Sequence, residues 1–299
     1  FLGPGTEPEA QHHFSWRERA DERFDNVRVM RDEQFAYHKN YAPFAPNGQY
    51  LAYMHNMKAT GAWERHHQAG KTDAVTGRFF EPRPSEEFYD NFKDFHNIDN
   101  QIDDPLHQTK IKELKKELRR QQLKYFDSGL MPEEMRNRMI KEKKTTVYAF
   151  VRDPKLYPLA KYLDYADLAL TRNKKKLKIL TKGLSSKDSV IRYWSVVGLL
   201  LLEKDAKPAI SALKKALDDS DEIPALAAWA IYKAGDKAFA EKWMLETITN
   251  NPGNKMLANI LDWMDEGSFS ILAKIPSDKL PKKGLLKDVV KRAEARKKG

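Results

Sequence analysis

Residues 26–40 read Asn-Val-Arg-Val-Met-Arg-Asp-Glu-Gln-Phe-Ala-Tyr-His-Lys-Asn, and this stretch decides the fold of the N-terminal part. The apolar residues that share one parity in it are Val27, Val29, Phe35 and Tyr37. Alternation of this kind is typical of strands that are buried on one face. Asp32 begins a polar interruption of the alternation, and Asp is a good turn residue. The stretch therefore predicts a hairpin with strands over residues 26–31 and 35–40.

A third strand and a long helix are predicted further along the chain. The strand is Glu87-Phe88-Tyr89-Asp90, and the helix covers residues 106–127. The helix has an apolar stripe at helical spacing, formed by Ile111, Leu114, Leu118 and Tyr125. Because a few strands are not stable in water without a covering partner, we expect this stripe to cover the sheet. The lysines and arginines on the other faces of the helix are expected to face solvent.

The C-terminal part has a repeating pattern of helix pairs. Trp194, Trp229 and Trp263 recur at intervals of about 35 residues, each within a helical segment that a second helix follows. Such a period indicates an α-solenoid, and the pattern resembles HEAT-like repeats. We expect the three rings to fill equivalent core positions rather than to form a row that stacks on a ligand. Since contacts in a solenoid are local, residues 150–299 are expected to fold without residues 1–127.

These patterns predict a small antiparallel sheet with a long helix, an α+β arrangement, followed by an all-α HEAT-like solenoid. The expected boundaries are a first domain at 1–127, a linker at 128–149 and the helical repeats at 150–299. The net charge of +10 is compatible with an anionic partner. No apolar run approaches the roughly 20 residues that a membrane-spanning helix needs. The chain has no cysteine, which excludes disulfides and thiol catalysis.

One region of the sequence resembles a known enzyme family. Residues 14–41 contain Arg-Glu-Arg-Ala-Asp-Glu-Arg-Phe-Asp, then Val-Arg-Val-Met-Arg-Asp, then a strand that ends in Lys-Asn-Tyr. Phe80-Glu81-Pro82, Glu86-Glu87-Phe88-Tyr89-Asp90, Asp94 and Asn100 extend the match. The pattern is similar to the C-terminal subdomain of bacterial type I sulfatases, in the branch related to arylsulfatases and heparan N-sulfatase. The similarity covers about residues 1–165.

The sequence departs from that family pattern at several positions. The family has proline where this chain has Phe95, and aspartate where it has Glu18. Ala36 and His38 stand where lysine and isoleucine are usual. We expect the hairpin to tolerate these changes.

The resemblance implies a catalytic apparatus that this chain lacks. Enzymes of the family hydrolyse sulfate with a formylglycine, made from Cys or Ser in a C/S-x-P-x-R motif, and with a calcium ion. The chain has no Cys, and none of its Ser residues is followed by x-Pro-x-Arg. The resemblance therefore implies the C-terminal part of a sulfuric ester hydrolase, with formylglycine and calcium in an upstream catalytic domain. No cofactor, catalytic residue or metal ligand is expected within this chain.

Arg17, Arg19, Asp21 and Arg23 are the candidate substrate-binding residues. The guanidinium of arginine suits sulfate or uronate oxygens, and an aspartate can accept from sugar hydroxyls. The alternative interpretation is an ion-pair network that holds this loop to the catalytic domain.

Two function classes remain open. The chain is either the C-terminal region of a sulfatase acting on sulfated glycans or a non-catalytic helical-repeat interaction protein with a sulfatase remnant. The expected partners are a sulfated glycan and the upstream catalytic domain. No nucleic acid is expected, because no aromatic and basic pattern of an RNA-binding sheet is present. The family implies a periplasmic or extracellular location, although no targeting signal is recognised in these residues. If the catalytic domain normally covers the sheet, one sheet face should be partly exposed, near Phe14, Trp16, Phe24, Phe79 and Phe80.

Overall fold

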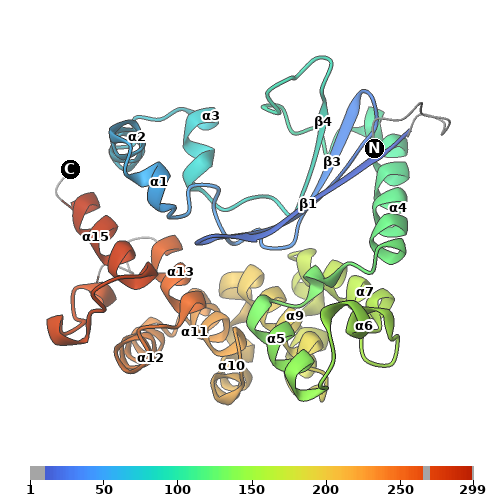
Figure 1. Ribbon diagram of the computed structural model, residues 1–299. Helices are drawn as coiled ribbons and strands as arrows, with labels where there is room; N and C mark the ends of the chain where they lie inside the picture. Colours follow the sequence, from blue (N-terminus) through green and yellow to red (C-terminus); the bar gives the residue numbers. More distant parts are fainter. Residues whose placement is uncertain (1–10, 265–269, 298–299) are drawn as a thin grey trace.

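A computed structural model describes residues 11–264 and 270–297. Its N-terminal part contains a four-stranded antiparallel sheet of order β1-β2-β3-β4 (Figure 1). The strands are β1 (His13–Ala20), β2 (Arg23–Arg31), β3 (Phe35–Asn40) and β4 (Glu86–Asp90). The predicted hairpin is confirmed as β2 and β3, and the predicted third strand is β4. The edge strand β1 was not predicted.

The predicted long helix is α4 (Gln108–Lys124), and it covers one face of the sheet (Figure 1). Its residues Ile111, Leu114 and Leu118 form a core with Met30, Tyr37 and Phe88. The prediction that Val27 and Val29 share one buried face with Tyr37 is wrong. Val29 pairs with His38, and Met30 pairs with Tyr37, so Val27 and Val29 lie on the opposite face from Tyr37. The hairpin register pairs odd with even residue numbers, so equal parity on the two strands means opposite faces.

An insertion of short helices separates β3 from β4. Its helices are α1 (Ala52–His55), α2 (Lys58–Gln68), α3 (Ala74–Gly77) and the 3₁₀ helix η1 (Arg78–Phe80). Trp63 of α2 stacks on Phe79 with ring centroids 4.6 Å apart and also contacts Phe80. Of the aromatic residues expected near an exposed face, Trp16 is 65% exposed, whereas Phe24 is buried. The expectation is therefore wrong for Phe24.

The rest of the chain is helical and forms an arc beneath the sheet (Figure 1). It begins with the 3₁₀ helix η3 (Ser128–Leu130). The α-helices are α5 (Glu133–Glu142), α6 (Val147–Arg152), α7 (Leu159–Leu170), α8 (Leu177–Gly183), α9 (Ser189–Leu202), α10 (Ile210–Lys215), α11 (Ile223–Ala234), α12 (Lys237–Asn250), α13 (Lys255–Trp263) and α15 (Leu285–Lys297). The 3₁₀ helix η2 (Pro105–His107) precedes α4. Further 3₁₀ helices of the arc are η4 (Lys174–Lys176), η5 (Glu203–Ala209), η6 (Ala216–Asp218) and η7 (Ser277–Lys279).

Neighbouring helices pack in sequence order: α9 packs against α7, α8 and α11, and α11 packs against α12 and α13. A small antiparallel sheet followed by a mostly helical region is confirmed, while the HEAT-like solenoid stays a prediction. Stretch 128–149, expected to be a linker, contains η3 and α5, and its Leu130, Met131 and Met135 are buried. The domain boundaries also stay predictions. No helix in the described part of the chain is long and apolar enough to cross a membrane.

The recurring tryptophans contact the sheet part. Trp194 packs edge-on against Tyr41, with ring centroids 5.8 Å apart, and its indole N–H donates to the carbonyl oxygen of Leu130 at 2.9 Å. Phe44 lies against both Trp229 and Trp263, at 5.9 and 6.0 Å. One buried apolar cluster therefore includes the segment after β3 and the helices of the arc.

Candidate functional site

The turn between β1 and β2 carries Asp21, one of the four predicted substrate-binding residues. Asp21 is exposed and has a left-handed backbone, with φ of 51°. Such a conformation is uncommon outside glycine, although Asp adopts it more readily than most residues. The turn faces α13 and the start of α15, which line a shallow depression with Asp21 and Glu22. The strand pairing thus places Asp21 at the boundary between the sheet part and the helical arc.

Arg17 and Arg23 converge on the buried carboxylate of Asp25. The Arg17 Nε lies 2.7 Å from one Asp25 oxygen, and an Arg23 terminal nitrogen lies 2.9 Å from the other. Their exposure differs, because the side chain of Arg17 is 46% exposed and that of Arg23 only 14%. Arg83, which is buried, approaches the same carboxylate at 3.8 Å. Three arginines therefore surround one carboxylate, and Arg17 is the one of them that is substantially exposed to a ligand.

Arg19 is directed away from this pair and into the helical arc. It donates to the carbonyl oxygen of Glu22 and to Oδ1 of Asn259 on α13, both at 3.2 Å. Its Nε also lies 3.4 Å from a carboxylate oxygen of Glu133 on α5. These contacts make Arg19 a link between β1, α5 and α13.

A cleft of about 330 Å³ opens beside Arg19 and Asp21. Its lining comes from β1, the turn, β2, α5 and α13, and consists of Glu18, Arg19, Asp21, Phe24, Glu133, Arg136 and Lys255. The Arg136 Nε is buried and has no hydrogen-bond partner among the described residues. Sequence reasoning missed Arg136 and Lys255, since nothing in their local sequence connects α5 or α13 with β1. Arg136 and Lys255 can bind a sulfate or carboxylate group of a ligand, while the Asp21 carboxylate can accept a hydrogen bond from a hydroxyl group.

Arg28 holds the wall of this cleft in place. It is fully buried and donates to both carboxylate oxygens of Asp127, at 2.7 Å each, and to Glu18. Burial raises the pKa of Glu18, and the neighbouring Arg28 charge opposes that rise. A Cβ on Gly129 would fall within 1.9 Å of both Arg28 and Glu18, so a larger residue here would have to displace this ion pair. Glu18, one of the departures from the family pattern, thus belongs to a buried ion-pair cluster.

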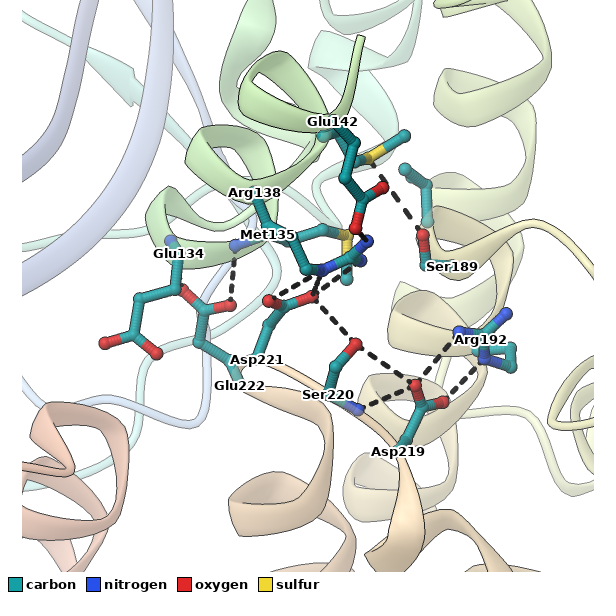
Figure 2. Close-up of polar contacts among 12 residues, drawn as sticks. Glu134, Met135, Arg138, Glu142, Ser189, Arg192, Asp219, Ser220, Asp221 and Glu222 are labelled. Atoms are coloured by element: carbon teal, nitrogen blue, oxygen red, sulfur yellow. Dashed lines mark hydrogen bonds and ion pairs between the residues drawn. The ribbon is translucent and has the colours of Figure 1, made fainter. Parts of the chain in front are cut away.

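A second polar network joins α5 to the segment before α11 (Figure 2). Arg138 donates to both oxygens of Asp221, at 3.0 and 2.8 Å, and Arg192 donates to both oxygens of Asp219. Beside the Arg138–Asp221 pair, the Glu222 carboxyl accepts from the backbone N–H groups of Glu134 and Met135 at the start of α5 (Figure 2). Burial raises the pKa of Glu222 to about 7.

Glu222 should make the stability of the protein depend on pH. Its ordinary carboxyl pKa is near 4.5, and its pKa in the folded protein is about 7. The folded state therefore favours the protonated form, and this contribution is fully present below pH 4.5 and is lost as the pH rises through 7. We expect Glu222→Gln, which cannot ionise, to gain stability relative to the wild type by up to about 3 kcal/mol from about pH 5 to about pH 8. Urea unfolding at several pH values measures the difference.

The exposed Glu142, at the end of the helix α5 whose first N–H groups Glu222 accepts from, provides a matched control. Glu142→Gln should change the stability by the same amount throughout that pH range. If the free energies of unfolding of wild type and Glu222→Gln change equally with pH, the buried carboxyl does not titrate as stated.

Calcium and formylglycine, which the resemblance implies, do not fit the described residues. Within residues 11–264 and 270–297, no cluster of three or more His, Asp or Glu side chains could hold a metal ion. The sequence also has no C/S-x-P-x-R motif. No step of sulfate hydrolysis is therefore assigned to the side chains of this chain.

Comparison with known proteins supports a coarse assignment. No family model matches the chain, and no solved structure matches it. A curated protein from Formosa agariphila, named an ulvan-active sulfatase, is 30% identical to the chain over 136 residues. The match covers 44% of this chain and 22% of that protein, so the chain spans about a fifth of the length of this relative. This similarity suggests that the chain contains a sulfatase-related region.

Proposed function

We propose that this chain is the C-terminal part of a sulfatase that hydrolyses sulfate esters or N-sulfates of sulfated glycans. In this role it supplies walls on the substrate side of the active site and not the nucleophile. The observation that carries the proposal is the cleft beside Asp21, where Arg136 has an unpaired buried Nε. The similarity to the ulvan-active sulfatase supports the same assignment, with ulvan as the first substrate to test.

The four candidate residues take two different roles in this proposal. Arg17 and Asp21 are exposed and contact substrate: the Arg17 guanidinium binds a sulfate or uronate, and the Asp21 carboxylate accepts a sugar hydroxyl. Arg19 and Arg23 are largely enclosed and hold the strands in position through Asn259, Glu133 and Asp25. Arg19 and Arg23 thus have a structural role within this chain, and the substrate interpretation applies to Arg17 and Asp21.

The remaining parts of the proposal concern the whole protein. Formylglycine and calcium belong to an upstream catalytic domain, where they supply the nucleophile and stabilise negative charge. The HEAT-like helices serve as an accessory or oligomerisation module. The protein acts in the periplasm or outside the cell. A C/S-x-P-x-R motif upstream in the same reading frame favours this function, and its absence favours a non-catalytic helical-repeat interaction protein.

Substitutions in the full-length protein test the substrate role. We expect Arg17→Ala and Asp21→Ala each to raise KM for ulvan by about tenfold, equivalent to about 1.4 kcal/mol, with little change in kcat. The same variants should hydrolyse a small aryl sulfate normally, because such a substrate does not extend to this wall. Steady-state kinetics on both substrates provides the measurement.

Arg120→Ala is the matched control, since Arg120 is exposed on α4 and, among the residues that the structure describes, pairs only with Glu117 of its own helix. It should leave both activities unchanged. Equal losses on ulvan and on the aryl sulfate would mean that Arg17 and Asp21 act through folding. Unchanged KM for ulvan would remove the substrate role.

A further inference from the structure

A larger cleft lies between α4 and the C-terminal end of α7, away from the turn that carries Asp21. Its volume is about 930 Å³. The start of β4 and the end of β3 form its floor, α4 forms one side, and the end of α7 with the following loop forms the other. The sheet with α4 and the helical arc therefore contribute opposite walls.

The charges on the floor of this cleft neutralise one another. The Lys39 ammonium lies 2.9 Å from both Glu86 and Asp167, and Lys115 reaches the other Glu86 oxygen at 2.5 Å. Burial alone would raise the pKa of Glu86, but Lys39 and Lys115 lower it to about 2. Glu86 is thus ionised at neutral pH, and the floor carboxylates can accept hydrogen bonds from hydroxyl groups.

The rim, in contrast, has an excess of positive charge. Lys116 stands on the α4 side and Arg172 on the α7 side, and both are exposed. Arg172 is followed by three consecutive lysines, Lys174–Lys176, which form η4. Within the described ranges, no carboxylate oxygen lies within 4.0 Å of these five side chains, and Arg172 donates only to the carbonyl oxygen of Arg83, at 3.5 Å. Unpaired cations on both sides of a groove attract an anionic chain and raise its local concentration.

We propose that this cleft binds a segment of a sulfated polysaccharide, as a second site separate from the substrate wall at Asp21. Lys116 and the Arg172–Lys176 segment bind sulfate groups, and the floor carboxylates Glu86 and Asp167 accept hydrogen bonds from sugar hydroxyls. A single-stranded nucleic acid fits less well, since it binds by stacking bases on accessible aromatic faces. The aromatic residues in the cleft, Tyr37 and Tyr41, have no more than 2% of their surface exposed, so they offer no ring face to a base.

Binding measurements on the chain as it stands test the proposal without any catalytic activity. The probes are heparin, dextran sulfate and uncharged dextran, in about 50 mM and about 150 mM sodium chloride. We expect the two sulfated polymers to bind and dextran not to bind. The variant Lys116→Glu/Arg172→Glu should lose at least about tenfold in affinity and show a weaker salt dependence. Its circular dichroism spectrum should match that of the wild type, because both side chains are exposed.

Two further variants separate the cleft from general surface charge. Lys242→Glu/Lys274→Glu lowers the net charge by the same amount as Lys116→Glu/Arg172→Glu, but at exposed positions outside the cleft. It should retain wild-type affinity. Thr171→Trp, at an exposed position in the cleft wall, should weaken binding by obstruction with no change in charge. Equal losses in both charge-reversal pairs, or no binding of heparin at the lower salt concentration, would overturn the proposal. So would poly(U) binding as tightly as heparin with the same sensitivity to Lys116→Glu/Arg172→Glu, because that result would identify a nucleic-acid site.

Discussion

Replacing Arg292 by methionine should lower the free energy of unfolding by about 3–5 kcal/mol. Arg292 lies on α15 with only 6% of its surface exposed. It donates to both oxygens of Asp262 on α13 at 2.7 Å, to Glu64 on α2 at 3.0 Å, and to the carbonyl oxygen of Gly48 at 2.7 Å. Methionine preserves much of the packing volume but leaves buried Asp262 without its close cation and Glu64 with Arg296 alone. Urea unfolding at neutral pH, followed by circular dichroism, measures the loss.

Arg296 offers a matched control on the same helix. It contacts the same two carboxylates, but its side chain is 24% exposed and lies 3.8 Å from Asp262. Arg296→Met should therefore cost much less than Arg292→Met. Adding Glu64→Gln and Asp262→Asn to Arg292→Met should recover part of the lost stability, since no buried charge then lacks a partner. An Arg292→Met protein within about 1 kcal/mol of the wild type would contradict the stated role of the cluster.

Separating the helical region from the sheet part should abolish cooperative folding. Local repeat contacts by themselves predict that residues 150–299 fold alone, but the shared core leads to the opposite expectation. Without the N-terminal part, Trp194 loses Tyr41 and the carbonyl oxygen of Leu130, Trp229 and Trp263 lose Phe44, and Arg292 loses Glu64. We expect the isolated piece to retain some helix, bind a hydrophobic dye and melt without a sharp transition.

A longer piece, residues 128–299, separates the contribution of η3 and α5 to folding from that of the sheet part. Residues 128–299 restore the Leu130 carbonyl oxygen and the buried residues of η3 and α5, but not Phe44 or Glu64. This piece should be more helical than residues 150–299 and still bind the dye. A cooperative melt of residues 150–299 with no dye binding would show that the repeats are self-sufficient and that the contacts with Phe44 and Tyr41 are dispensable.

The elements predicted from sequence were those with strong local periodicity. The stripe of Ile111, Leu114 and Leu118 identified α4 because spacing along a helix determines which side chains share a face. The strand β1 escaped prediction because Trp16 and Arg17 of this edge strand are exposed, so no buried face marks it in the sequence. The insertion with α1, α2 and α3 was also missed, since two of its helices are a single turn long.

The candidate site was predictable only in part for the same reason. Arg17, Arg19, Asp21 and Arg23 lie close together in the chain, so the sequence predicts that they lie near one another in space. Their different roles do not, because these depend on Asp25, Glu133 and Asn259, which lie on three different elements. The contribution of Arg136 and Lys255 to the cleft depends on how α5 and α13 pack against the sheet.

The sequence by itself determined the hairpin, the long helix and the recurrence of Trp194, Trp229 and Trp263, because each of these rests on contacts between near neighbours in the chain. Only the tertiary structure decided that the tryptophans pack against Tyr41 and Phe44, that Arg292 joins α15 to α2, and that unpaired cations line a cleft between α4 and α7. These features bring together residues separated by tens to hundreds of positions. Their partners are selected by shape and charge complementarity between whole elements, which a local pattern does not encode.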